Sequence, residues 1–172
     1  FLSNQHYSGK QLPGPAQNAR LALHIALSLR AAQQREGNWE PANQGRSLRY
    51  TCHALEALHL LGLPAFDNLL DLGQNWLMNL SEDIHEESEE WVSVRLHPSR
   101  FKTLARLARF GERQVLAEFD ELRSRISAQG LLNNVIHDPL LGSIIVCDCL
   151  LDLQEQDAMP PSGAELLERI LP

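Results

Sequence analysis

The chain has 172 residues, of which 44% are hydrophobic and 22% charged, and its formal net charge is -7 at pH 7. This length suits one domain with a single core. The acidic balance argues against nucleic acid as a partner, since phosphate neutralisation needs a clustered basic surface, and no run approaches the roughly 18 apolar residues of a membrane span.

Helical periodicity and helix-breaking residues divide the chain into consecutive segments. Residues 1–16 predict an irregular N-terminal segment, because Pro13-Gly14-Pro15 interrupts them. Beyond it, apolar residues recur at helical spacing between glycine and proline breaks. We expect helices over residues 16–34, 48–61, 65–80, 98–110, 113–128 and 139–154, and a short one near the C-terminus. Strand patterns are limited to short ambiguous runs, so the predicted fold class is all-α.

The predicted helices form pairs, and the pairs repeat. Trp39 and Trp91 lie in the loops of the first two pairs, 52 residues apart (91 − 39), and Leu131 is expected at the corresponding place in the third. ALEALHLLG (54–62) matches TLARLARFG (103–111), including the closing glycine. Repetition at this period is typical of stacked helical hairpins. We therefore expect three hairpins over residues 17–155, then a linker and the start of a further helix over residues 156–172.

The loop of the first pair carries a recognisable pattern. Gln33 is followed by Gly37-Asn38-Trp39, and the second pair has Trp76 and the late Trp91. This resembles the QW repeat of squalene–hopene cyclases and the related repeat of protein prenyltransferase β subunits. The resemblance implies an (α/α) toroid in which the second helix of each hairpin belongs to an inner ring. Three hairpins are too few to close such a ring, so we expect an arc or incomplete toroid; HEAT- or TPR-like arrays remain the alternative.

The pattern in this loop also has a structural interpretation. Gly37 lets the chain leave the first helix, Gln33 or Gln34 can satisfy backbone groups at the helix end, and Trp39 would pack over the junction between hairpins. We therefore expect Gln33, Gly37, Trp39, Trp76 and Trp91 to form a structural joint.

Four positively charged side chains are the strongest candidates for a binding site. Lys102, Arg106, Arg109 and Arg113 are spaced 4, 3 and 4 residues apart along the predicted fourth helix and just beyond it. Lysine and arginine pair well with phosphate oxygens, so this row predicts a site for a diphosphate or another anion. The alternative is a solvated charged face.

The other two predicted inner helices present polar residues of mixed charge. Arg49, His53 and Glu56 share a stripe on one, and Asp148 and Asp152 share a stripe on the other. We expect them on the concave face of the array.

The three cysteines have no disulfide framework, which favours a reducing compartment, and we expect a cytoplasmic protein. Cys52-His53 and Cys147-Asp148-Cys149 contain zinc-type ligands. However, Cys147 and Cys149 point apart on one helix, and buried apolar cysteine is the favoured interpretation. The sequence therefore predicts no metal site, and it does not identify which cofactor, if any, the protein uses.

Two hypotheses for function follow. The first is a non-catalytic repeat module that binds a protein partner or ligand on its concave face, because the acid and metal motifs of the resembling enzymes are missing. The partner could equally be the remaining repeats of a larger chain. The second is part of a cyclase- or prenyltransferase-like enzyme that acts on an isoprenoid diphosphate, with its catalytic residues outside this chain.

Overall fold

The computed structural model describes residues 14–40, 48–80, 95–134 and 138–171. Over these ranges the chain forms helices and no strand, which confirms the all-α prediction. A 3-10 turn, Pro64–Phe66, precedes the third helix. The α-helices are α1 (Pro15–Ala32), α2 (Leu48–Leu61), α3 (Asp67–Met78), α4 (Pro98–Arg106), α5 (Arg113–Ser124), α6 (Pro139–Glu155) and α7 (Pro161–Ile170).

Proline and a side-chain cap set the starts of α4 and α6 where the sequence predicts them. Both helices have proline at their first position, where the missing N–H group costs no hydrogen bond. The Asp138 carboxylate accepts from the backbone N–H groups of Leu140 and Leu141, at 3.0 and 3.1 Å. Such caps satisfy N–H groups that have no partner within the helix.

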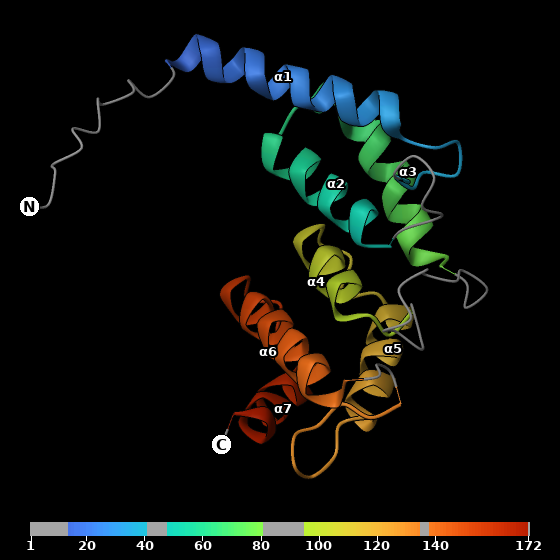
Figure 1. The fold of residues 1–172 in the computed structure, drawn as a ribbon, viewed down its shortest axis with the longest axis vertical. Helices are drawn as coiled ribbons and strands as arrows, with labels where there is room; N and C mark the ends of the chain where they lie inside the picture. Colours follow the sequence, from blue (N-terminus) through green and yellow to red (C-terminus); the bar gives the residue numbers. More distant parts are fainter. Residues whose placement is uncertain (1–13, 41–47, 81–94, 135–137, 172) are drawn as a thin grey trace, which may run out of the picture.

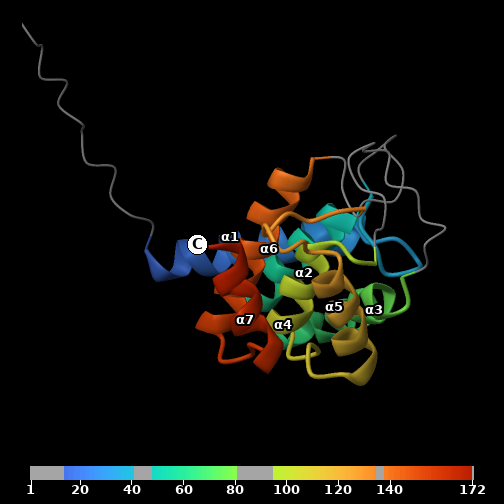
Figure 2. The same cartoon turned by 90° about the horizontal axis from the view of Figure 1, so that it is seen from below.

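The helices are arranged as a row with a second layer behind it. Figures 1 and 2 show α2, α4 and α6 side by side, with α3 and α5 along one side of this row. α1 contacts α2 at one end, and α7 contacts α6 at the other. The second helix of each hairpin thus packs against the second helix of the next, and we call α2, α4 and α6 the α2–α4–α6 row.

Buried side chains form the core between the row and the layer behind it. Leu55, Leu104 and Leu150 are each 0% exposed, one on each helix of the row. Phe101 of α4 also packs edge to face against Phe119 of α5, with ring centroids 5.7 Å apart. Burial of such side chains contributes about 1.5–3 kcal/mol each.

Four helices end earlier than the sequence predicts, α1 and α3 by two residues and α4 and α5 by four. α4 ends at Arg106 and not at 110, and α5 ends at Ser124 and not at 128. After α4, Ala108 adopts a left-handed backbone with φ 57°, and the N–H of Arg109 bonds to the carbonyl of Leu104 at 2.8 Å. This is a Schellman ending with alanine where glycine is usual. Gly111 was the predicted stop, and the chain has already left the helix before it.

The loop between α1 and α2 is the predicted structural joint. Trp39 is 4% exposed, and its indole Nε1 donates to the carbonyl of Leu29 at 2.8 Å. The Gln33 amide donates to the carbonyls of Gly37 and Leu69, both at 3.0 Å. These contacts tie the end of α1 to its own loop and to α3.

Gly37 fits this loop because it meets two demands that only glycine satisfies. Its φ is +102°, and a methyl group there would lie 2.5 Å from the carbonyl oxygen of Leu72 in α3. The loop of the first hairpin therefore rests directly on the backbone of the second.

In the third hairpin, Leu132 takes the place of Trp39. The N–H of Trp39 donates to the Thr51 hydroxyl at 3.0 Å, and the N–H of Leu132 donates to the Ser143 hydroxyl at 2.9 Å. The prediction of Leu131 for this place is wrong by one residue, since Leu131 is 37% exposed and Leu132 fully buried.

The two remaining tryptophans of the predicted joint differ in what the structure shows. Trp76 is buried in α3, at 9% exposed. Trp91 lies outside the described residues.

Candidate functional site

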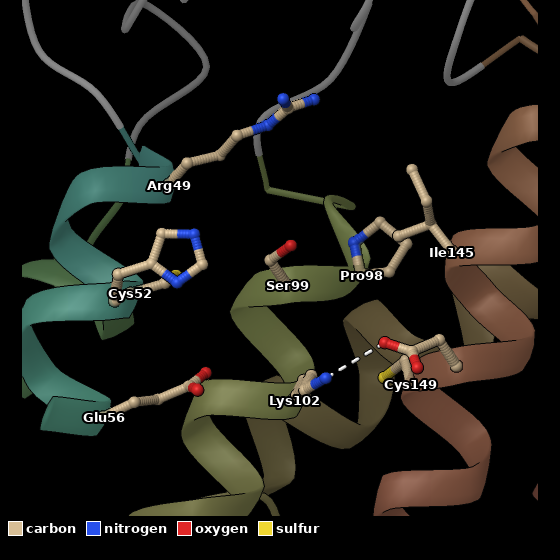
Figure 3. A pocket seen from close by; sticks show the side chains of 10 residues that line it. Arg49, Cys52, Glu56, Pro98, Ser99, Lys102, Ile145 and Cys149 are labelled. Atoms are coloured by element: carbon tan, nitrogen blue, oxygen red, sulfur yellow. Dashed lines mark hydrogen bonds and ion pairs between the residues drawn. The ribbon is translucent and has the colours of Figure 1, made fainter. Parts of the chain in front are cut away.

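A cavity of about 190 Å³ opens on the α2–α4–α6 row (Figure 3). Each of the three helices contributes to its wall, so it exists only because the hairpins stack. Figure 3 shows Arg49 and Glu56 reaching it from α2, Ser99 and Lys102 from α4, and Ile145 from α6. The full lining is Arg49, Cys52, His53, Glu56, Pro98, Ser99, Lys102, Ile145, Asp148 and Cys149.

Lys102 is held between two carboxylates of α6. Its ammonium group lies 2.6 Å from Asp152 Oδ2 and 3.0 Å from Asp148 Oδ2. Burial opposes the charge of Lys102, but the hydrogen bonds that it donates to Asp152 and Asp148 outweigh this effect and raise the pKa of the ammonium group above its ordinary value. The lysine is therefore positively charged at neutral pH, and the carboxylates of Asp148 and Asp152 already balance this charge.

Arg106 extends this network to α2. Its guanidinium pairs with Glu56 of α2 and with Asp152 of α6, the latter at 3.0 Å. The other oxygen of Glu56 accepts from the Thr103 hydroxyl at 2.8 Å. One chain of ion pairs thus crosses all three helices, and the predicted concave-face acids are the counterions of the predicted cations.

The structure does not place the four predicted cations on one helix face. Because α4 ends at Arg106, Arg109 lies beyond it and pairs with Glu112. Arg113 is the first residue of α5 and is exposed. Only Lys102 and Arg106 of the predicted anion-binding row contact the residues of this face.

The cavity rim carries side chains that reach solvent. Arg49 and His53 of α2 are exposed, and the Asp148 side chain is 66% exposed. The rim therefore offers charges of both signs above a network that is internally paired.

Two cysteines line the cavity, and both are buried. Cys52 and Cys149 are each 2% exposed. Burial, and then the charge of Asp152, raises the pKa of Cys149 to about 12, so it is a thiol at neutral pH. Within the described ranges, no three His, Cys, Asp or Glu side chains gather as a metal site.

A buried ion pair behind the row was not predicted from the sequence. Arg100 of α4 is 0% exposed and pairs with Glu118 of α5. It also donates to the carbonyls of Leu77, at 2.8 Å, and Arg95, at 3.1 Å. The sequence did contain a signal for this pair. Arg100 is a charged residue at the position that Thr51 occupies one repeat earlier, and this position lies on the buried side of the helix.

The residue that caps α4 was also missed. His97 is 1% exposed, and its Nδ1 accepts from the N–H of Ser99 at 3.1 Å. Burial, followed by the charge of Arg49, lowers the pKa of His97 to about 3. A neutral imidazole can accept this hydrogen bond and a protonated one cannot.

Comparison with known proteins leaves the resemblance to cyclase repeats without support from a relative. No protein-family model, curated protein or solved structure matches this chain. Among the helices described, none has the length and apolar character to cross a membrane.

Proposed function

We propose that the chain is a helical-repeat binding module that takes a protein partner on the α2–α4–α6 row. The observation that carries the proposal is the cavity that Arg49, Ser99, Lys102 and Ile145 line from three successive hairpins. Its volume, about 190 Å³, suits one inserted side chain. Pockets for drug-sized ligands are larger, typically about 300–1,000 Å³.

The charge arrangement supports the same function. Lys102, Arg106, Glu56 and Asp152 pair among themselves, so they fix the three helices relative to one another. A preformed surface loses little conformational freedom when a partner binds. The exposed His53, and Asp148, which pairs with Lys102 but keeps 66% of its side chain exposed, can contact the partner's polar groups.

An isoprenoid diphosphate is the alternative ligand, and two observations weigh against it. Lys102 and Arg106 would have to leave Asp152 and Glu56 to bind phosphate oxygens. Arg109 and Arg113 lie off the row and could not assist. Titration of farnesyl diphosphate into the wild type and Arg106→Ala tests this alternative, and it requires binding that the substitution weakens.

The binding module is tested by photo-crosslinking from the row. A photoreactive residue at Ser99, in the cavity wall, is expected to capture a specific protein, whereas the same residue at the exposed Asp120 of α5 is not. The captured protein is then purified and its affinity measured by calorimetry. Ser99→Trp fills the cavity and is expected to weaken binding at least about tenfold, equivalent to about 1.4 kcal/mol, while Asp120→Trp leaves it unchanged.

Three results would contradict the proposal. They are equal capture from both positions, a Ser99→Trp protein that binds as tightly as the wild type, and turnover of a small substrate by the chain alone.

A further inference from the structure

The helices of the α2–α4–α6 row have corresponding positions. Three pairs of residues are all buried: Leu55 and Leu58 on α2, Leu104 on α4 with Leu107 at its C-cap, and Leu150 and Leu153 on α6. They relate the helices by shifts of 49 residues (104 − 55) and 46 residues (150 − 104). Lys102 and Asp148, which pair directly, are also 46 residues apart (148 − 102). Corresponding residues therefore lie side by side along the row.

Each helix of the row has two sides that matter for stacking. We call the side toward the preceding helix the leading face and the side toward the following helix the trailing face. Between α2 and α4, Glu56 on the trailing face of α2 contacts Thr103 on the leading face of α4, and also Arg106, whose guanidinium reaches Asp152 of α6 as well. The side chains of Glu56, Thr103 and Arg106 are polar or charged.

At the two ends of the row, the same positions are apolar. Leu151 on the trailing face of α6 corresponds to Glu56. Ala54 and Ala57 on the leading face of α2 correspond to Thr103 and Arg106. The positions on both sides of the contact are thus apolar at the ends of the row, although the two ends lie far apart in the molecule.

The end faces also match in shape. The trailing face of α6 carries large side chains, with Leu140 61%, Ile144 57% and Leu151 43% exposed, beside a groove of about 410 Å³. The leading face of α2 carries the small Ala57 and the buried Ala54, which is 6% exposed, beside a groove of about 340 Å³ that Ile25, Leu29 and Trp39 also line. Large aliphatic side chains on one face would fill the hollow left by alanines on the other.

We propose that the chain associates with a second copy of itself head to tail, the trailing face of α6 packing on the leading face of α2 in the next copy. This contact continues the helix-to-helix stacking already present between α2, α4 and α6. It sets Leu151 against Ala54 and Ala57 of the second copy, and Asp148 beside the second copy's His53. Because the two faces differ, the interface is heterologous, and blocking either face disables it.

The test uses two single variants, each of which blocks one face. Leu151→Glu places a carboxylate opposite alanines that offer it no counterion, and Ala57→Arg places a guanidinium opposite a leucine. We expect wild type to associate with rising concentration in sedimentation velocity and each variant to weaken association at least about tenfold. Leu60→Glu is the matched control, because Leu60 is 79% exposed on α2 and lines neither groove.

Mixing the two variants gives the decisive measurement. The Ala57→Arg protein keeps an intact α6 face and the Leu151→Glu protein keeps an intact α2 face, so the mixture is expected to form a 1:1 complex. Circular dichroism melting verifies that all variants fold. The proposal is overturned if wild type stays monomeric to millimolar concentration, if the mixture stays monomeric, or if Leu60→Glu weakens association equally.

Discussion

Replacing Glu118 by glutamine removes one charge from the buried contact between α4 and α5. Glu118 is 5% exposed and accepts from Arg95, Arg100 and Gln114. The substitution keeps the shape of the side chain and one carbonyl acceptor. It leaves the fully buried guanidinium of Arg100 without its counterion.

The expected loss follows from the burial of this pair. Removing one partner of a buried ion pair costs about 3–5 kcal/mol, because the other charge stays in the interior. The remaining acceptor of glutamine, and the two carbonyls that Arg100 also contacts, place the expected loss near the lower limit. For a chain of this size, about 3 kcal/mol lowers Tm by roughly 6–12 °C.

Urea unfolding of the wild type and Glu118→Gln measures this loss directly. Glu121→Gln is the matched control, because it lies on the same helix in an exposed pair with Arg125 at 3.0 Å, and such pairs are worth about 0.3–0.5 kcal/mol. A Glu118→Gln loss within 1 kcal/mol of the control would refute the reasoning.

The same substitution changes the acid response of the fold. Burial alone would raise the pKa of Glu118, but the hydrogen bond from Arg95 and the charge of Arg100 outweigh it and hold this pKa below its ordinary value of 4.5. The resulting stabilisation is complete above pH 4.5 and is lost as the pH falls through the lowered pKa. The difference between wild type and Glu118→Gln should therefore shrink on acidification below pH 4.5.

Two further substitutions test the loop and the cap. Gly37→Ala should lower the free energy of unfolding by about 3 kcal/mol or more, because it combines a strained backbone with a methyl group against Leu72. Gly62 also has a positive φ, +57°, but open space surrounds it, so Gly62→Ala should cost only about 1–2 kcal/mol. Equal losses in urea unfolding would show that the clash with α3 is unimportant. His97→Asn keeps a side-chain cap but removes an imidazole whose pKa is lowered from 6.5 to about 3. Wild type should therefore lose stability as the pH falls from 6.5 to 3, by up to about 1.4 kcal/mol per pH unit. The variant should lack this pH dependence. Parallel melting curves of the two proteins at pH 7 and pH 5 would contradict the assignment.

The features that were predicted from the sequence are those encoded within a short segment. The all-α class and the starts of α4 and α6 follow from helical periodicity and from Pro98 and Pro139. The joint at Gln33 and Trp39 was also predicted, because its glycine, amide and indole all act within one loop. The third hairpin has no tryptophan in its loop to show which residue corresponds to Trp39. Leu131 and Leu132 are the same residue type and differ only in the direction in which each side chain points.

The features that were missed depend on contacts between helices. Lys102 and Asp152 are separated by 50 residues in the chain, and nothing local pairs them. The early end of α4 depends on Ala108 accepting a left-handed backbone that its residue type disfavours. Arg100 was missed for a related reason, since a buried charge becomes favourable only once Glu118 of the next hairpin is in place.

The glycines of the hairpin loops affect the order in which the hairpins can fold while the chain is being synthesised. The loop at Gly37 rests on Leu72 of α3, and the loop at Gly130 rests on Arg169 of α7, where a methyl group would lie 2.8 Å from the carbonyl oxygen. In both cases the support belongs to the helix that follows the hairpin. A chain synthesised from its N-terminus therefore finishes each of these hairpins only after one more helix has emerged from the ribosome. Its folding on the ribosome should lag behind synthesis by one helix.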